Sequence, residues 1–237
     1  MFSFTSNIRF SETDPDRNLT LSNLINYFQD CSTFQSEAIG RGFDFLEPRN
    51  RVWLLSSWQV ILHRLPRLGE AVQIGTWAHE FSALFGGRNF IMKTESDELL
   101  AVANSIWILA DTTTGRPVKI TPEYAEGYET GEPFPMEYAP RKIATPAQYT
   151  EETPFTITQS HLDYNQHVNN AQYIRMAEGF LPEDFEVGEL RANYQKSALL
   201  HDVIHPLVTI EDSTCTVVLA DESHTPFTII QFIRRKP

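Results

Sequence analysis

The chain has 237 residues, of which 41% are hydrophobic and 21% charged, and its formal net charge at neutral pH is −12. This length suffices for two domains of about 110 residues, each with its own core, and the composition excludes an intrinsically disordered chain. The acidic balance argues against a nucleic-acid-binding protein, because such proteins normally present a basic face.

The N-terminal half predicts one helix followed by four strands. Apolar residues between positions 21 and 39 recur at spacings of three and four, and Gly40 suits the end of that helix. The runs typical of strands that follow are 52–62, 71–79, 88–95 and 99–111. The residues around 111–115 predict a turn.

The C-terminal half repeats this order of elements. Several prolines and the lack of any period between 126 and 152 predict a linker. A helix is expected at about 170–179, and strands at 189–198, 202–211, 213–221 and 226–234. One helix against an antiparallel sheet, present twice, predicts an α+β fold.

Two stretches of the first half have counterparts in the second half. Residues 11–19 resemble residues 160–168, and a constant offset of 149 positions relates Asp14 to Asp163. The same offset relates Asp16 to Asn165 and Asn18 to His167, and residues 68–72 resemble 200–204. Weak identity in a conserved order indicates a duplicated domain.

Signatures of several enzyme classes are missing from the sequence. It holds no Gly-x-Ser-x-Gly elbow, no phosphate-binding glycine loop and no dinucleotide fingerprint. His201 and His205 have a spacing that zinc-binding helices use, but Pro206 and the predicted strand disfavour a helix there. We therefore expect neither a metal nor an organic cofactor.

Three polar residues, Asp163, Asn165 and His167, stand directly before the second predicted helix. One interpretation is structural: a polar loop followed by an Asn169 or Asn170 cap. The other is catalytic, because an imidazole can act as a base near neutral pH and helix N-terminal amides can stabilise an oxyanion. The residues alone leave both interpretations open.

A longer motif favours the catalytic interpretation, because it resembles that of the plant-type and bacterial fatty acyl-ACP thioesterases. These proteins are double hotdogs, in which each half wraps an antiparallel sheet around a long helix. The resemblance covers nearly the whole chain, although its central part is shared with single-domain acyl-CoA thioesterases. The motif reads Asp163-x-Asn165-x-His167-Val168-Asn169-Asn170-x-x-Tyr173.

The resemblance implies a role for each part of the chain. Residues 1–128 would form an N-terminal, non-catalytic hotdog that houses the acyl chain, 129–152 a linker, and 153–237 the catalytic hotdog. Asp163, Asn165 and His167 would carry catalysis. The expected substrate-binding residues are Val168, Asn169, Asn170, Tyr173, Trp58 and Ser197. Plant members carry a Glu-Cys pair where this chain has Ser197 and Ala198, so the second carboxylate could be dispensable, replaced by a water on Ser197 or supplied from elsewhere in the chain.

The implied activity is hydrolysis of a fatty acyl-ACP thioester by a water that His167 activates. An acyl-CoA thioesterase and a non-catalytic acyl-binding hotdog are the alternatives. The implied partner is an acyl carrier protein bearing a fatty acyl chain, and arginines of the first half, among them Arg64 and Arg67, are candidates for docking it. Nucleic acid and membrane are not expected as partners, the location is expected to be cytoplasmic, and a homodimer stays open.

Overall fold

The computed structural model describes residues 1–236, which form two compact units. Unit 1 comprises residues 1–56 and 63–139, and unit 2 comprises residues 57–62 together with the chain from Pro140 onward. Strand β2 (Arg51–Leu62) therefore begins in unit 1 and ends in unit 2. Among residues 1–236, no helix has the length and apolar character needed to cross a bilayer.

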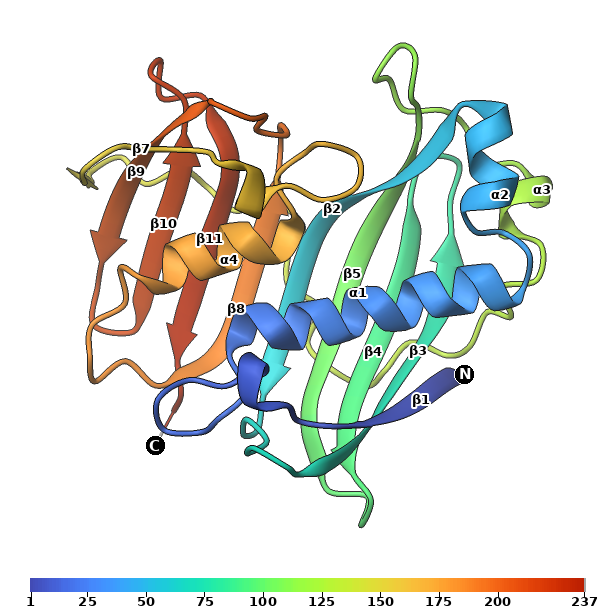
Figure 1. Cartoon of the computed structure of the whole chain (residues 1–237), viewed down its shortest axis with the longest axis horizontal. Helices are drawn as coiled ribbons and strands as arrows, with labels where there is room; N and C mark the ends of the chain where they lie inside the picture. Colours follow the sequence, from blue (N-terminus) through green and yellow to red (C-terminus); the bar gives the residue numbers. More distant parts are fainter. Residues whose placement is uncertain (237) are drawn as a thin grey trace. The chain divides into compact units, whose positions relative to one another are not determined.

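Unit 1 is an antiparallel sheet with a long helix lying across one face (Figure 1). Helix α1 (Leu21–Ala38) contacts β1 and β3, and the strands lie side by side in the order β1-β3-β4-β5. The strand bounds are Phe2–Asn7 for β1, Ala71–Phe81 for β3, Gly86–Thr94 for β4 and Leu99–Asp111 for β5. Two short helices flank this core, α2 (Phe43–Leu46) and α3 (Pro122–Ala125).

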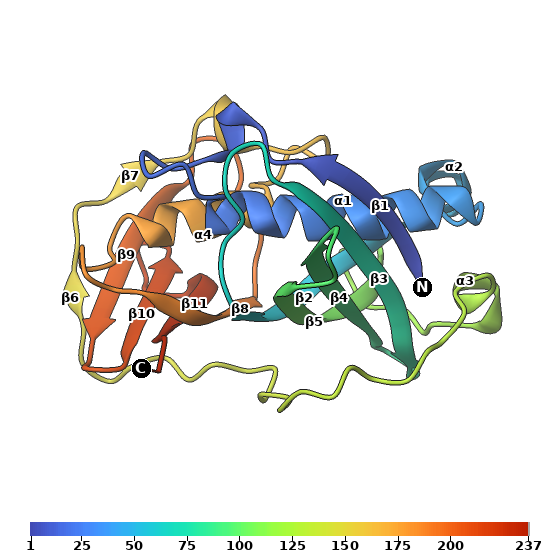
Figure 2. The ribbon, with the colours of Figure 1, turned by 90° about the horizontal axis from the view of Figure 1, so that it is seen from below.

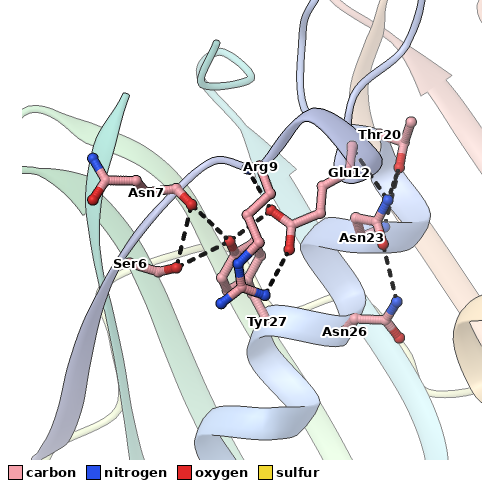
Figure 3. A network of polar contacts seen from close by, with 8 residues as sticks. All are labelled: Ser6, Asn7, Arg9, Glu12, Thr20, Asn23, Asn26 and Tyr27. Atoms are coloured by element: carbon pink, nitrogen blue, oxygen red, sulfur yellow. Dashed lines mark hydrogen bonds and ion pairs between the residues drawn. The ribbon is translucent and has the colours of Figure 1, made fainter. Parts of the chain in front are cut away.

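Local sequence signals define both ends of α1. Thr20 caps its start by accepting a hydrogen bond from the backbone amide of Asn23, and Gly40 follows its end with a φ of +67°. A polar network anchors the first turn (Figure 3): the carboxylate of Glu12 bonds the Tyr27 hydroxyl at 2.8 Å and the Arg9 backbone amide at 2.8 Å. The N-terminus of α1 is thereby tied to β1 and to the turn η1 (Phe10–Glu12).

The other face of the unit 1 sheet is covered by the chain that follows α3 (Figure 2). Thr130 pairs with Ala78, and Trp77 donates its indole N–H to the Glu132 carbonyl at 2.9 Å. Asn89 of β4 accepts hydrogen bonds from the Phe134 amide and the Tyr138 hydroxyl. Residues 130–139, predicted as part of the linker, thus pack on this sheet.

Unit 2 repeats the arrangement with a shorter helix. Helix α4 (Asn170–Glu178) contacts β10 and β11, and the strands lie in the order β8-β11-β10-β9-β6, with the second half of β2 beside β8 and β7 beside β9 (Figure 1). The bounds are Thr150–Glu151 for β6, Phe155–Thr156 for β7, Val187–Tyr194 for β8, Val203–Ile210 for β9, Thr214–Ala220 for β10 and Pro226–Arg234 for β11.

The predicted helices and long strands agree with these elements, but strands β1, β6 and β7 were not predicted, β6 lies in the predicted linker, and one predicted strand is too long. Strand β1 was not expected, because its residues alternate between half-buried and exposed positions and form no continuous apolar run. The predicted strand 189–198 ends at Tyr194. Beyond that point the amides of Gln195 and Lys196 both donate to the Phe227 carbonyl, and a single shared acceptor breaks the ladder.

The turns at residues 68–72 and 200–204 have the same backbone hydrogen bonds in the two units. Gly69 and His201 each have a positive φ, +80° and +72°, and their amides donate to Ile8 and Ile157 respectively. Glycine adopts this backbone conformation without steric cost, whereas histidine does so under strain. The 68–72 and 200–204 similarity in sequence is therefore a shared backbone turn.

We expect Gly69→Ala to lower the free energy of unfolding by about 1 kcal/mol, because alanine disfavours the left-handed conformation. An added Cβ at Gly69 meets nothing within 4 Å, so the loss would come from the backbone alone. Gly179→Ala is the matched control: Gly179 has a φ of −63°, and alanine there should be neutral or stabilising. Urea denaturation measures both; equal losses would contradict the backbone explanation.

Candidate functional site

The loop that carries the predicted catalytic residues is closed by one aspartate. Asp163 Oδ1 accepts hydrogen bonds from the backbone amides of Asn165 at 2.8 Å and His167 at 3.3 Å. The Asp163 amide donates to the His167 carbonyl at 2.8 Å, and Gln166 takes a φ of +62°. Asp163 thus holds the loop through its backbone, which is a recurrent use of aspartate in turns.

The loop presents the other two side chains outward. Asn165 is exposed and His167 half-buried, and no hydrogen bond to the His167 imidazole is formed by any residue that the structure describes. The two ring nitrogens of His167 therefore make no hydrogen bond to the described part of the protein. An imidazole without such bonds can accept a proton from a small molecule that reaches it, or donate a proton to that molecule.

Backbone contacts seat the loop in front of helix α4. The Val168 amide donates to the Ala198 carbonyl at 3.0 Å, and the Asn169 amide donates to the His161 carbonyl at 2.9 Å. Asn169 caps α4 by accepting a hydrogen bond from the Ala171 amide at 2.8 Å. The positive end of the helix dipole therefore lies directly after His167 in the chain.

These contacts restrict how an oxyanion could be bound. The amides of residues 168, 169, 171 and 172 each already donate to an acceptor within the chain. A developing oxyanion at this helix would be stabilised by the helix dipole and by side-chain donors such as the Asn165 carboxamide, and not by those four amides.

Two tyrosines support the site through hydrogen bonds to backbone groups next to it. The Tyr173 hydroxyl accepts a hydrogen bond from the Ala198 amide at 2.8 Å, and the Tyr194 hydroxyl donates to the Asn170 carbonyl at 3.1 Å. The two rings meet edge to face, with 6.0 Å between their centroids. Burial raises the pKa of Tyr173 to about 12 and also raises that of Tyr194, so both stay protonated at neutral pH.

The predicted substrate-binding residues fall into three groups, one of which, Asn169 and Asn170, is half-buried at the start of α4. Val168, Tyr173 and Trp58 are buried, with 3%, 2% and 2% of their surface exposed. Ser197 is exposed and precedes Ala198, whose carbonyl and amide bond Val168 and Tyr173. The segment around Ser197 therefore lies against the motif, although it follows Asp163 by more than thirty residues.

The large apolar residues Phe28, Trp53, Leu55 and Trp58, which could line an acyl tunnel, are divided between the two units. Phe28 lies on α1 in unit 1, with its ring centroid 5.3 Å from that of Phe90 in β4. Trp53 and Leu55 lie in the first part of β2, and Trp53 packs into a separate cluster beneath α2 and α3. Trp58 lies in the part of β2 that belongs to unit 2, opposite Ala192.

The first unit has the same loop with different side chains. Asp14 Oδ1 accepts the Asn18 amide at 2.8 Å, the Asp14 amide donates to the Asn18 carbonyl at 2.9 Å, and Arg17 takes a φ of +67°. Every one of these positions is related to unit 2 by the offset of 149 residues. Asn18 occupies the place of His167, so this copy has the scaffold of the loop without its imidazole.

The arginines of the first half do not form a surface of unpaired positive charge. Arg64 holds both Glu70 and Glu98, at 2.7 and 2.6 Å. Other arginines considered for docking are also ion-paired, Arg41 with Glu126, Arg49 with Glu123 and Arg51 with Asp111. Arg64 is thus neutralised within the chain, whereas Arg67 forms no ion pair with any described residue, and docking of an acidic carrier by these two arginines stays a prediction.

The two cysteines are free and buried, one in each unit. Burial raises the pKa of Cys31 to about 12 and that of Cys215 to about 11, so neither forms the thiolate that a nucleophile requires. We expect a variant with both Cys31→Ala and Cys215→Ala to hydrolyse thioesters at close to the wild-type rate. Steady-state assay and mass spectrometry test this; an acyl group trapped on either sulfur would contradict it.

Sequence reasoning missed the bracing role of Tyr194 and Ala198. Tyr194 lies inside the predicted strand 189–198, and nothing in the sequence indicates that its hydroxyl bonds Asn170. Tyr194 at the end of β8 bonds Asn170 of α4, and Ala198 in the segment after β8 bonds Tyr173 of α4. Both are long-range contacts.

Comparisons with known proteins agree with this architecture. The solved structure of an acyl-ACP thioesterase from Bacteroides thetaiotaomicron superposes with a TM-score of 0.89 at 21% identity, covering 98% of this chain and 97% of that one. The 12:0-ACP thioesterase from Umbellularia californica gives a TM-score of 0.84 at 20% identity, covering 99% and 96%. A hypothetical protein from Aquifex aeolicus matches 54% of this chain with a TM-score of 0.51. The predicted tandem hotdog fold is confirmed.

Sequence comparison extends the likeness to curated proteins. The chloroplastic palmitoyl-acyl carrier protein thioesterase of Gossypium hirsutum is 29% identical over 233 residues, which cover 90% of this chain and 56% of that protein. The chain spans about half the length of the curated relatives it matches. Residues 1–128 match the acyl-ACP thioesterase N-terminal domain and residues 144–224 the acyl-ACP thioesterase C-terminal domain. The chain belongs to the acyl-ACP thioesterase family.

Proposed function

We propose that this protein hydrolyses fatty acyl-ACP thioesters to a free fatty acid and the carrier thiol. The observation that carries the proposal is the match to both domains of the family in the family's order, together with an imidazole in unit 2 that no described residue engages. The relatives named above as acyl-ACP thioesterases support the choice of carrier. Hydrolysis needs no redox step and consumes one water for each thioester.

In this proposal His167 is the general base. Its neutral imidazole takes a proton from a water, which attacks the thioester carbonyl carbon and forms a tetrahedral oxyanion. Asn165 is exposed next to His167 in the loop and would hold the water or the oxyanion through its carboxamide. Collapse of the intermediate breaks the carbon–sulfur bond, and the imidazolium returns its proton to the departing sulfur.

Asp163 would act by positioning. Its Oδ1 already accepts the amides of Asn165 and His167, which supports a role in holding the two catalytic side chains in one loop. Val168, Asn169, Asn170 and Tyr173 would form the supporting wall of the site. Ser197 is exposed beside Ala198, and we propose that a water held on its hydroxyl takes the place of the second carboxylate of plant members.

We propose that the two halves have different roles, one binding the acyl chain and the other carrying out the chemistry. The N-terminal domain, residues 1–128, would house the acyl chain beneath α1, where Phe28 and Phe90 provide apolar surface. The C-terminal domain, residues 153–237, would carry the chemistry, with 129–152 as the connection. The two free, buried cysteines support a reducing and therefore cytoplasmic setting.

The deciding experiment compares matched acyl chains on two carriers. Purified protein would be assayed with saturated chains of eight to eighteen carbons, each loaded on acyl carrier protein or on coenzyme A, and the free thiol measured. We expect kcat/KM to be higher for the acyl-ACP substrate at every chain length. A preference for acyl-CoA would assign the protein to that carrier, and binding without turnover of either would make it an acyl-binding protein.

A further inference from the structure

Asp202 is a half-buried carboxylate of unit 2 that has no part in the mechanism proposed above. Its Oδ2 accepts a hydrogen bond from the Leu199 amide at 2.8 Å, and its own amide donates to the Leu199 carbonyl at 3.1 Å. These two bonds close a turn over residues 199–202. The turn directly follows Ala198, whose carbonyl accepts the Val168 amide.

A single peptide group connects Asp202 to the loop that carries the imidazole. The peptide that joins Ala198 to Leu199 accepts the Val168 amide at its carbonyl, at 3.0 Å, and donates its N–H to Asp202. Because the carbonyl and the N–H of a trans peptide point in opposite directions, this peptide lies between the two groups that it bonds. Hydrogen bonds in such a chain polarise one another, so the carboxylate strengthens the bond to Val168, which directly follows His167.

Unit 1 has the same turn, but its carboxylate is neutralised. Glu70 Oε2 accepts the Arg67 amide at 2.9 Å, and the Glu70 amide donates to the Arg67 carbonyl at 2.9 Å. The Pro66 carbonyl, which precedes this turn, accepts the Leu19 amide at 2.8 Å. The guanidinium of Arg64 donates to both carboxylate oxygens of Glu70, at 2.7 and 3.0 Å. The backbone chain of bonds is therefore common to both units, and the state of the carboxylate differs.

In unit 2 the cation at the place of Arg64 binds a different carboxylate. An offset of 132 residues relates Glu70 to Asp202. The same offset places Lys196 at the position of Arg64, but Lys196 Nζ lies 3.0 Å from Asp221 Oδ2. Within residues 1–236, no cation forms an ion pair with Asp202. A carboxylate that keeps its charge accepts an amide hydrogen bond about twice as strongly as a neutral acceptor does, and this carboxylate is in the unit that carries the imidazole.

Tyr173 bonds the same segment. Its hydroxyl accepts the Ala198 amide at 2.8 Å, so the N–H and the carbonyl of Ala198 and the N–H of Leu199 are all engaged. Burial is the main cause of the raised pKa of Tyr173, and the charges of Asp202 and Asp163 add to it. Both carboxylates therefore lie within electrostatic range of the hydroxyl that holds Ala198.

We propose that Asp202 is a positioning residue for the reaction and holds His167 in place through the peptide between Ala198 and Leu199. The inference rests on the proposed function, because it takes His167 as the base. The imidazole makes no hydrogen bond to the described part of the protein, so its position depends on the backbone at residues 167 and 168. Asp163 restrains this backbone from inside the loop, and Asp202 restrains it from the neighbouring segment.

The test compares three substitutions of Asp202 in the whole chain. Asp202→Ala removes the acceptor and should lower kcat for an acyl-ACP substrate about tenfold, with KM changed by less than about twofold, because a small displacement of a catalytic group is costly while substrate contacts stay the same. Asp202→Asn keeps a neutral acceptor and should lower kcat about threefold. Asp202→Glu should retain most of the wild-type kcat, because Glu70 shows that the longer side chain reaches the equivalent amide.

Glu70→Ala is the matched control, because it opens the same turn beside a loop without an imidazole. It should lower the midpoint of thermal unfolding and leave kcat at the wild-type value. A purely structural role for Asp202 predicts the same result for Asp202→Ala, so a lower midpoint with unchanged kcat would overturn the inference. Where Asp202→Ala does not fold, Asp202→Asn decides: a loss of kcat at constant KM supports the inference, and an unchanged kcat overturns it.

Amide hydrogen exchange provides a readout that needs no turnover. In Asp202→Ala the Val168 amide should exchange about tenfold faster, because the carbonyl that accepts its bond is no longer restrained. The Leu19 amide has the equivalent bond in unit 1 and should exchange at the wild-type rate, whereas a global loss of stability would accelerate both.

The failures of the two proposals are distinguishable. Wild-type protein that hydrolyses acyl-ACP, with Asp202 variants of unchanged kcat, refutes the role of Asp202 alone. Wild-type protein that hydrolyses no acyl thioester refutes the proposed function. In that case the Val168 amide still tests the restraint, and equal exchange rates in wild type and Asp202→Ala would overturn the inference.

Discussion

Replacing His167 by alanine is expected to lower kcat for acyl-ACP hydrolysis by about 10²–10⁴-fold, the usual contribution of general acid–base catalysis. The protein should stay folded, because no described residue bonds the imidazole and its removal leaves no buried partner unsatisfied. Single-turnover measurement of free thiol, with thermal unfolding of the same preparation, checks both parts of this expectation.

Two control variants separate the chemistry from the scaffold. Asn18→Ala changes the equivalent position of the unit 1 loop, which has the same backbone hydrogen bonds but no imidazole. His201→Ala removes a different histidine of unit 2, one that is exposed. Both should retain nearly full hydrolysis. A His167→Ala enzyme with more than half of the wild-type rate, or an Asn18→Ala enzyme with an equal loss, would refute the assignment of the base.

The periodicity of apolar residues was sufficient to predict the helices and long strands. Helix α1 has a buried stripe on one side and clear signals at both ends in Thr20 and Gly40. Strand β11 has the predicted bounds because a proline-containing turn precedes it. Strand β1 escaped prediction because only alternate residues are half-buried, and the pairs it makes with β3 are far away in sequence.

The duplication was the most informative signal for the site. Because Asp14 and Asp163 recur at one offset, the backbone loop could be expected twice, and the structure shows equivalent bonds from Asp14 to the Asn18 amide and from Asp163 to the His167 amide. What the local pattern could not predict is which chain segments meet the loop. The bond from the Ala198 amide to Tyr173 and the ion pairs of Arg64 depend on tertiary contacts that no periodicity encodes.

The second large effect is expected at Asp163. Asp163→Ala removes the acceptor of the Asn165 and His167 amides, and each unsatisfied donor costs about 1–3 kcal/mol where water cannot replace the bond. The loop, with Gln166 at a φ of +62°, would then lose the constraint that holds Asn165 and His167 together. We expect kcat to fall about 10–100-fold, since displaced catalytic groups lose much of their effect.

Asp163→Asn distinguishes positioning from charge. The carboxamide oxygen of asparagine can accept the same two amide hydrogen bonds, so a positioning role predicts that Asp163→Asn recovers most of the kcat lost in Asp163→Ala. A role for the negative charge itself predicts that both variants lose equally and that the pH dependence of kcat shifts in both, because a neighbouring carboxylate favours the imidazolium.

Asp14→Ala completes the comparison, because Asp14 makes the equivalent bond to the Asn18 amide in unit 1. If aspartate serves the loop in both units, Asp14→Ala and Asp163→Ala should both lower the free energy of unfolding, Asp163→Ala by more because it loses the bonds of two amides and Asp14→Ala that of one. Only Asp163→Ala should lower kcat. Hydrolysis at the wild-type rate by Asp163→Ala would show that the loop keeps its geometry without this carboxylate. The positioning role would then pass to the contacts of Val168 and Asn169 with Ala198 and His161, which would be the remaining restraints on His167.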